Sequence, residues 1–250
     1  MKCKVEIPPV ASVAGKLSRL RAALAHLWTV MATNFYIDGF NLYYGAVKTR
    51  WPQFKWLDIG AFCSALLPTH TINRIRYFTA LVIPPPEDPQ MRIRQDIYLR
   101  ALRTVPNLHV HDEGWFILKE DLRRQFPLAY PKNRPVGSSP QSVHVQLPEE
   151  KGSDVNLASY LLLDCFQGDF DEAVVISNDA DLAVPIDMVV TKFHKTVGVV
   201  NPHPKSRRSV TLQKVASWTF QTLNRHHLAN SQFPPTLTDS QGTITKPAAW

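Results

Sequence analysis

The sequence has few cysteines and no long apolar run. Its three cysteines, Cys3, Cys63 and Cys165, are widely spaced and include no Cys-x-x-Cys pair, so neither a disulfide framework nor a zinc site is indicated. No apolar segment approaches the roughly 20 residues that a helix needs to cross a bilayer. We therefore expect a protein of the reducing cytoplasm that does not use a membrane.

The chain also has fewer acidic than basic residues, and it has no Gly-rich dinucleotide fingerprint. Lys and Arg number 28 against 21 Asp and Glu, which gives a formal net charge of +7. This balance favours anionic partners such as nucleic acid, although ordinary basic solubility explains it equally well. The missing fingerprint argues against dinucleotide use. With 250 residues, 44% of them hydrophobic, the chain is long enough to bury a sizeable core.

The beginning of the chain loosely imitates a signal peptide. Residues 1–30 combine a basic front with the short apolar stretch "AALAHLWTVMA", but His26 interrupts that stretch and Met31 offers an alternative start. We expect an N-terminal extension over residues 1–32, one domain over 33–222 with a basic insertion at about 119–142, and a flexible C-terminal tail over 223–250.

From Asn34 onward, short β-rich runs alternate with helical patterns. The continuous apolar run in "EAVVISND" is typical of a strand in the middle of a parallel sheet. This alternation predicts an α/β fold, a three-layer α/β/α sandwich with a central, mainly parallel sheet. Strands are expected over 34–38, 74–83, 108–118, 172–179 and 196–202, and helices over 56–67, 88–105, 155–166 and 181–194.

Four aspartates fall where predicted strands end or helices begin. Asp38 ends the first strand, Asp179 and Asp181 follow "AVVIS", and Asp154 opens a helix after "EEKGS". Because parallel sheets bind ligands beyond the carboxyl ends of their strands, we expect these carboxylates to converge. Taken singly, each is equally well explained as a helix cap or a turn residue. Together they would repel one another unless a cation compensated them.

Three blocks carry a family resemblance. In order, "FYIDGFNLYYG", "EEKGSDVNLASYLL" and "VVISNDADLAVPIDMV" resemble the signature blocks of the NYN domain family, the PIN-like nucleases typified by LabA-type bacterial proteins. The sequence departs at Asn178, where the family often has Gly, and at Leu182, where Phe is common. It keeps Asp38, Gly39 and Asn41 in the first block, Lys151, Gly152 and Asp154 in the second, and Ser177, Asp179 and Asp181 in the third.

The resemblance implies a Rossmann-like PIN fold and a metal site. Mg²⁺ or Mn²⁺ would be held by Asp38, Asp154 and Asp179, with Asp181 as a further or water-mediated ligand, and oxygen-only ligation agrees with these hard ions. Such ions can activate a water for in-line attack on a phosphodiester. Asn41 completes the expected catalytic set by orienting Asp38, although it serves equally well as a turn residue.

Five further residues are candidate substrate contacts. Lys151 is suited to a phosphate beside the metals, Ser177 to a hydrogen bond with a carboxylate, and Tyr43 to stacking on an unpaired base. Arg207 and Arg208, in "KSRR", are suited to backbone phosphates. Each has a plainer alternative: a solvated loop for the cations, sheet-edge bonding for the serine and packing for the tyrosine.

Three functions of different classes remain open at this point. The first is a metal-dependent endoribonuclease acting on single-stranded or structured RNA. The second is a non-catalytic RNA-binding or regulatory module with the same fold, and the complete acid set argues against it. The third is an enzyme of small phosphorylated substrates, and the lack of an Asp-x-Asp nucleophile motif after the first strand argues against an aspartyl-phosphate phosphatase. We expect the first, with RNA as partner, and leave DNA binding and a homodimer open.

Overall fold

The computed structural model of the protein describes residues 31–124, 142–220 and 223–250. The predicted N-terminal extension, residues 1–32, lies almost entirely outside the described residues, and so does most of the predicted insertion at 119–142. In the described ranges, no helix is both long enough and apolar enough to cross a membrane.

A mostly parallel sheet forms the centre of the domain. Its order is β4-β3-β2-β1-β5-β6-β7, and each neighbouring pair is parallel except β3 with β4. The predicted α/β class with a mainly parallel sheet is confirmed. The strands are β1 (Ala32–Asp38), β2 (Thr71–Ala80), β3 (Leu108–Arg124), β4 (Ser142–Lys151), β5 (Glu172–Ile176), β6 (Thr196–Val200) and β7 (Trp218–Thr219).

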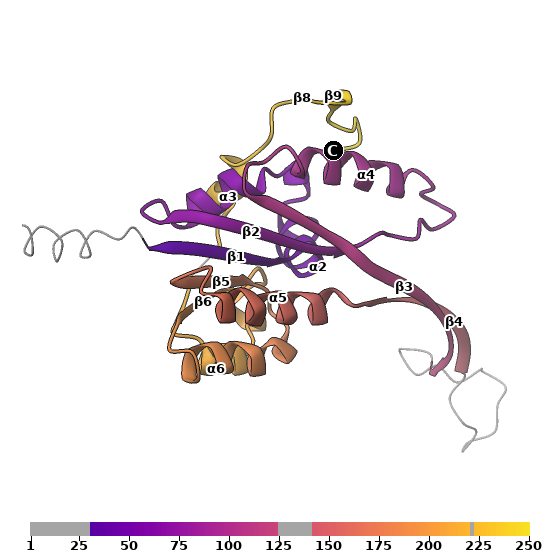
Figure 1. The fold of residues 1–250 in the computed structure, drawn as a ribbon. Helices are drawn as coiled ribbons and strands as arrows, with labels where there is room; N and C mark the ends of the chain where they lie inside the picture. Colours follow the sequence, from indigo (N-terminus) through magenta and orange to yellow (C-terminus); the bar gives the residue numbers. More distant parts are fainter. Residues whose placement is uncertain (1–30, 125–141, 221–222) are drawn as a thin grey trace, which may run out of the picture. The chain divides into compact units, whose positions relative to one another are not determined.

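Helices cover both faces of the sheet, because successive strand side chains point to opposite faces. In β1, Phe35 and Ile37 pack into one buried apolar cluster and Tyr36 into another. The first cluster takes in α3 (Ile59–Leu66) and α4 (Met91–Leu102), and the second takes in α5 (Ser153–Gln167), α6 (Ala183–Thr191) and α7 (Val210–Val215). Figure 1 shows α3 and α4 on one side of the strands and α5 and α6 on the other.

A buried polar network ties the sheet to α5. Arg76 of β2 donates two hydrogen bonds of 2.7 Å to the Asp164 carboxylate, which also accepts one of 2.7 Å from the Tyr36 hydroxyl. The same guanidinium lies 4.4 Å from the centre of the Tyr160 ring and 3.1 Å from Nε2 of His111. Each charge is thereby paired and hydrogen-bonded inside the domain, as buried charges must be.

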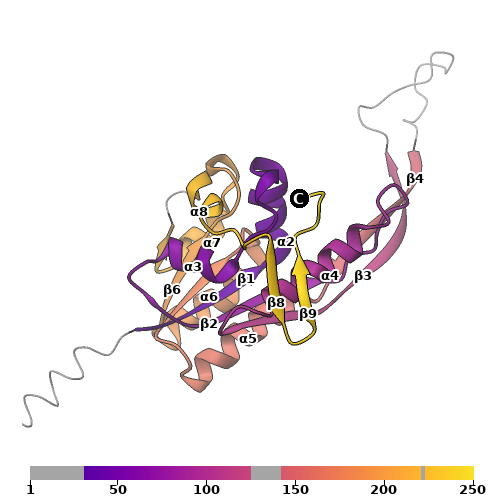
Figure 2. The ribbon, with the colours of Figure 1, turned by 90° about the horizontal axis from the view of Figure 1, so that it is seen from above.

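The C-terminal segment differs from the predicted flexible tail over 223–250. It forms α8 (Arg225–Ala229) and the hairpin β8 (Thr236–Asp239)–β9 (Gly242–Thr245), which Figure 2 shows beside α4. Leu228, Phe233 and Ile244 are buried in the first apolar cluster. Arg100 of α4 donates hydrogen bonds of 2.7 and 2.5 Å to the carboxylate of Asp239. Apolar burial and this ion pair therefore hold the segment on the domain.

The part of the predicted basic insertion that the structure describes continues the sheet. It begins inside β3, which pairs antiparallel with β4 from Trp115 opposite Lys151 to Arg124 opposite Ser142. Figures 1 and 2 both show this ribbon running beyond the ends of the other strands. The stretch that joins its two strands, 125–141, lies outside the described residues.

Candidate functional site

The carboxyl edge of the sheet holds the acids that the sequence singled out. β1 lies between β2 and β5, so the connections that leave β1 and β5 diverge there, and ligands of parallel sheets bind in such a crevice. Asp38 is the last residue of β1, and Asp179 follows β5 closely. Asp154 lies in the first turn of α5, and Asp181 in the 3₁₀ turn Ala180–Leu182.

Asp38 is buried, and its carboxylate is engaged by neighbouring side chains. Oδ1 accepts a hydrogen bond of 2.9 Å from the backbone N–H of Asn41. Oδ2 accepts one of 2.7 Å from the Asn41 amide and one of 2.9 Å from the Ser177 hydroxyl. Burial raises the pKa of Asp38, and these hydrogen bonds oppose the rise. Asn41 and Ser177 are therefore donors to Asp38.

The other three acids lie near Asp38. Oδ1 of Asp179 accepts a hydrogen bond of 2.9 Å from the backbone N–H of Asp181, so Asp179 caps that turn. The pKa of Asp154 is raised from 3.8 to about 7, first by burial and then by the negative charges of Asp38, Asp179, Glu150 and Asp181. The structure thus brings the four predicted acids together. Their assignment as catalytic residues stays a prediction.

These acids are nevertheless not arranged as metal ligands. Among the described residues, no group of three or more His, Cys, Asp or Glu side chains could hold a metal ion. Both oxygens of Asp38 and one of Asp179 accept hydrogen bonds from protein donors. In the structure, Asp38 and Asp179 therefore serve as the cap residues of the turns that follow them, as the sequence also allowed.

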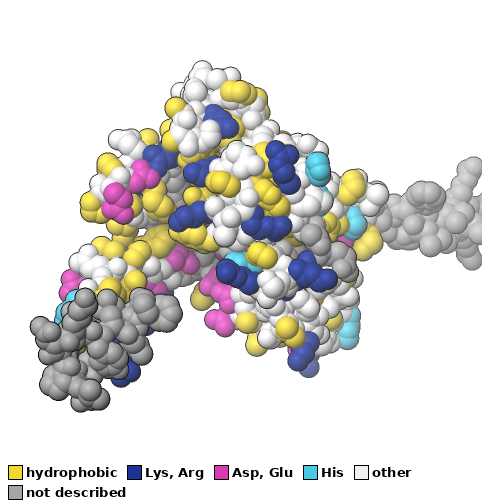
Figure 3. All heavy atoms as spheres, turned by 180° about the vertical axis from the view of Figure 1, so that it is seen from behind, with side chains coloured by type: hydrophobic (Ala, Val, Ile, Leu, Met, Phe, Trp, Pro, Cys, Tyr) yellow, Lys and Arg dark blue, Asp and Glu magenta, His cyan; other side chains and the backbone are white. Residues whose placement is uncertain are grey.

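The predicted substrate contacts come from separate segments of the chain, and Ser177 among them bonds directly to Asp38. Lys151 forms an ion pair with Glu149 on β4. Arg207 is exposed at the end of the 3₁₀ turn Lys205–Arg207, and its backbone carbonyl accepts a hydrogen bond of 2.9 Å from the Asn178 amide; Arg208 follows it. Figure 3 shows a face on which Lys and Arg side chains gather with hydrophobic ones between them. RNA as a partner stays a prediction.

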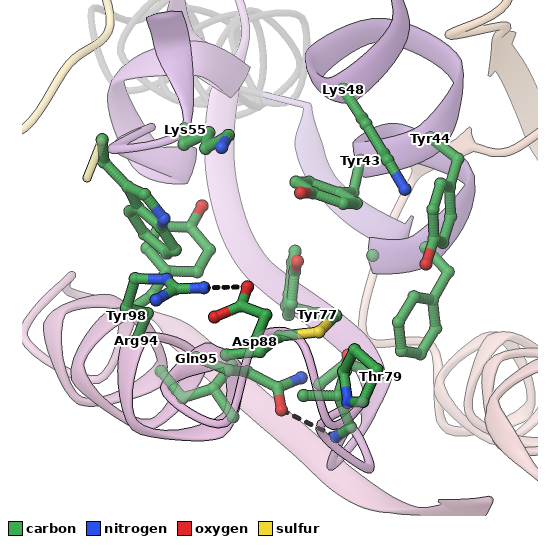
Figure 4. Close-up of a pocket in the computed structure, with 17 residues that line it drawn as sticks. Tyr43, Tyr44, Lys48, Lys55, Tyr77, Thr79, Asp88, Arg94, Gln95 and Tyr98 are labelled. Carbon is green, nitrogen blue, oxygen red and sulfur yellow. Dashed lines mark hydrogen bonds and ion pairs between the residues drawn. The ribbon is translucent and has the colours of Figure 1, made fainter. Parts of the chain in front are cut away.

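A cavity lined by aromatic side chains lies beside the acids. Its volume is about 350 Å³. Figure 4 shows Tyr43 and Tyr77 at its middle, with Lys48 and Lys55 across from Asp88, Arg94 and Gln95. Aromatic walls with a few polar groups are typical of small-molecule sites. The aromatic lining consists of Phe40, Tyr43, Tyr44, Tyr77, Tyr98 and Trp250.

Most polar groups of the α4 wall are already engaged. Arg94 forms an ion pair with Asp88. The Gln95 amide donates a hydrogen bond of 2.8 Å to the carbonyl of Ala80, and its oxygen accepts one of 2.8 Å from the N–H of Val82. The hydroxyl of Tyr98 donates one of 2.9 Å to the Leu57 carbonyl. These bonds fix the shape of the wall and leave recognition of a ligand to the opposite side.

The opposite side offers two ammonium groups and a hydroxyl. Neither Lys48 nor Lys55 forms an ion pair with another residue that the structure describes, and the Lys48 ammonium lies 4.9 Å from the centre of the Tyr44 ring. The Tyr77 hydroxyl has no hydrogen-bond partner within the described ranges, and Figure 4 shows it directed into the cavity. Burial, followed by the charge of Asp38, raises the pKa of Tyr77, which therefore stays a hydrogen-bond donor.

The acidic edge and the cavity share one turn of the chain. Asp38 caps α2 (Gly39–Leu42), and the next two residues, Gly39 and Phe40, line the cavity. A Cβ atom on Gly39 would lie 2.7 Å from the Tyr77 ring and 2.8 Å from the carbonyl oxygen of Phe78. A side chain at this position would clash, so glycine lets the backbone after Asp38 pack directly against Tyr77.

Sequence reasoning missed most of this cavity. It singled out Tyr43, which does line the cavity, but as a surface for stacking bases. The sequence "YYGAVK" could have indicated part of this cavity, because its two tyrosines precede Lys48 by about one turn of helix and so lie near it. Tyr77, Tyr98 and Trp250 carried no local signal, because only the folded chain brings them together.

The chain was compared with known proteins. It is 30% identical over 246 residues to 6-hydroxy-3-succinoylpyridine 3-monooxygenase HspA of Pseudomonas putida (strain DSM 28022 / S16), a match that covers 88% of this chain and 75% of that protein. No family model matches the chain. A crystal structure of a protein of unknown function from Vibrio parahaemolyticus RIMD 2210633 gives a TM-score of 0.44 at 17% identity, over 76% of this chain and 93% of that one.

The similarity to a monooxygenase overturns several predictions from the sequence. The endoribonuclease assignment is wrong, and so are the hydrolase and nuclease classes that go with it, because a relative over most of the chain is named as a monooxygenase. The Mg²⁺ or Mn²⁺ cofactor is also wrong, since no metal-holding group exists in the part of the chain described. The resemblance to the NYN domain family stays a prediction.

Proposed function

Because the chain belongs to the family of the Pseudomonas putida monooxygenase HspA, we propose that it is an oxidoreductase that attaches one oxygen atom of O₂ to a ring carbon of a small aromatic acid. The observation that carries this proposal is the cavity, which combines aromatic walls with two ammonium groups that have no acidic partner among the described residues. Its volume of about 350 Å³ suits a ligand of one ring with a short side chain.

A substrate such as 6-hydroxy-3-succinoylpyridine has the features that this cavity complements. Its planar ring packs against Tyr43, Tyr44 and Phe40, because aromatic rings prefer stacked and edge-to-face contacts. Its succinoyl chain ends in a carboxylate that Lys48 or Lys55 can bind. The Tyr77 hydroxyl, which stays protonated, donates a hydrogen bond to a ring substituent.

The proposed reaction consumes molecular oxygen and a reductant. In the relative's name the oxygenated position is ring carbon 3, which carries the succinoyl group and no hydrogen. One oxygen atom of O₂ forms the new hydroxyl on that carbon, the bond from the carbon to the succinoyl group breaks and the group leaves as an aldehyde, and the other oxygen atom is released as water. Four electrons and four protons balance the reaction, and a reduced nicotinamide or flavin is the class of donor that supplies such electrons. The residues of this chain bind and orient the ring, and the aromatic walls exclude water from it.

The carboxyl edge of the sheet does not fit the phosphates of a dinucleotide. Such phosphates bind free N–H groups at a helix N-terminus after a Gly-rich turn. Here the side chain of Asp38 accepts the N–H of Asn41 at the start of α2, and Asp154 and Asp179 add negative charge nearby. We therefore assign no step to a flavin or nicotinamide bound at this edge.

We also infer the finer architecture. The mainly parallel sheet has apolar clusters on both faces, each packed with helices, and its connections diverge between β1 and β5. These features support a Rossmann-like three-layer sandwich. A PIN fold in particular stays a prediction.

Binding is the first test. Titration of 6-hydroxy-3-succinoylpyridine into the protein, followed by calorimetry, is expected to show one site. Lys48→Met and Lys55→Met each remove an ammonium from the cavity, and loss of a charged hydrogen bond should raise Kd by about tenfold in at least one of them. Lys192→Met, at an exposed lysine that ends α6, is the matched control and should leave Kd unchanged.

Turnover is the second test. Protein, substrate, reduced nicotinamide and added flavin are incubated under ¹⁸O₂, and the product is analysed by mass spectrometry. One ¹⁸O atom in the product supports the proposal. Binding without labelled product would refute the monooxygenase reaction while keeping the cavity as a ligand site, and absence of binding would refute the cavity assignment.

A further inference from the structure

The β3–β4 ribbon exposes large apolar side chains on both of its faces. Leu118 and Leu122 lie on one face, and Ile117, Val143 and Leu147 on the other, each at least 40% exposed. A two-stranded ribbon that runs beyond its sheet is marginally stable in water, because it has no layer on which to bury these groups. Exposed apolar surface on such an element indicates an interaction site.

The outer edge of β4 is protected along only part of its length. Proteins guard free strand edges with proline and charged residues. Pro148, Glu149, Glu150 and Lys151 supply such protection at the base of β4. The stretch from Val143 to Leu147 contains no proline and no Asp, Glu, Lys or Arg, and among the described residues β4 is the last strand of the sheet on this side. This stretch is therefore open to a further strand.

We propose that two copies of this chain pair along their β4 edges, antiparallel, about a two-fold axis at Val145. In this register Val145 faces its own copy, and Val143 faces the partner subunit's Leu147. Because side chains alternate between faces along a strand, these residues form one continuous apolar stripe across the pair. A two-fold axis requires such a self-complementary surface. This interface does not depend on the proposed function.

Charge supports a second copy as the occupant. On the other face of β4 the same register sets His144 against the partner subunit's Gln146, so it brings no like charges together. Several charged residues of the ribbon are paired within it: Lys119 and Lys151 with Glu149, and Arg123 with Asp121. The stretch from Val143 to Leu147 itself carries no Asp, Glu, Lys or Arg, so a partner strand of strong net charge would find no counter-charge along it, whereas an identical neutral strand fits it.

Cross-linking tests the register. In a Cys3→Ser background, Val145→Cys places two thiols directly opposite each other, at a separation from which a disulfide can form. The remaining native cysteines, Cys63 and Cys165, are buried. We expect a covalent dimer on mild oxidation of Val145→Cys. Val143→Cys alone should give none, and a mixture of Val143→Cys with Leu147→Cys should cross-link. Cross-linking of Val143→Cys alone would overturn the register.

Sedimentation equilibrium of the full-length protein tests the interface itself. The wild type is expected to be a dimer at micromolar concentration. Val145→Lys sets two lysines face to face and should raise the dimer dissociation constant roughly tenfold or more, and an equimolar mixture with Val145→Glu should restore dimers. Val184→Lys, at an exposed valine on α6, is the control. A monomeric wild type, or a Val145→Lys variant as dimeric as the control, would overturn the proposal.

Discussion

Asp154→Asn should make the protein more stable above neutral pH and leave it nearly unchanged in mild acid. The pKa of Asp154 is raised from 3.8 to about 7, chiefly by burial and then by Asp38 and Asp179. Between these two values the unfolded chain carries the charge while the folded protein keeps the proton. Folding is therefore penalised increasingly as pH rises from about 4 to about 7, and asparagine, which has the same size and no charge, escapes the penalty.

The size of this effect on stability follows from the two pKa values of Asp154. At about 1.4 kcal/mol per pKa unit, the difference between 3.8 and about 7 corresponds to roughly 4 kcal/mol as an upper limit. Asp154 is only half-buried, so solvent screens part of this, and we expect about 1–2 kcal/mol at pH 8.

Urea unfolding of wild type and Asp154→Asn at pH 4, 6 and 8 measures the difference directly. Asp187→Asn, at an exposed carboxylate on α6, is the control and should differ little from wild type at each pH. The reasoning would be refuted if Asp154→Asn were less stable than wild type at pH 8, or if the difference in free energy of unfolding did not grow with pH. Either result would mean that the negative charge of Asp154 is not destabilised by burial and by the other three acids.

Three further changes test other parts of the structure. Gly39→Ala forces a Cβ atom against Tyr77 and should lower the free energy of unfolding by about 1–3 kcal/mol in urea unfolding; an unchanged value would contradict the close approach. Asp164→Asn leaves the Arg76 guanidinium without its counter-charge and should cost roughly 3–5 kcal/mol in the same assay, so a loss below about 1 kcal/mol would mean that water reaches the network. Trp250→Ala removes one wall of the aromatic cavity and should raise Kd for the aromatic acid about three- to tenfold by calorimetry, whereas an unaltered Kd would place the ligand elsewhere.

The sheet could be predicted because its strands carry strong local patterns. The apolar run "EAVVI" is wholly buried as β5, and the predicted strand at 34–38 lies within β1. The C-terminal segment could not be predicted in this way. Leu228, Phe233 and Ile244 are buried, but they are too far apart in sequence to show a helical or strand period. Their burial depends on a surface that the rest of the chain builds.

The acids show the limit of motif reasoning at a site. Their convergence followed from the rule that connections diverge at the carboxyl edge of a parallel sheet. Their chemistry depended on which groups donate to Asp38, and the donors, Asn41 and Ser177, approach from separate segments. The cavity was harder still, since Tyr77 comes from β2, Tyr98 from α4 and Trp250 from the C-terminal segment. No window of sequence contains such a set.

The turn from Asp38 to Phe40 links two equilibria, the protonation of Asp38 and the binding of a ligand in the cavity. Its first residue takes up a proton with a raised pKa, and its last two residues form part of the cavity wall. A ligand that shifts Phe40 also shifts the N–H groups that hold the Asp38 carboxylate, so it changes the proton affinity of that acid. By reciprocity, protonation of Asp38 changes the affinity for the ligand by the same factor. An aromatic acid binding in this cavity should therefore release or take up a fraction of a proton, and calorimetry in buffers of different ionisation enthalpy would count it.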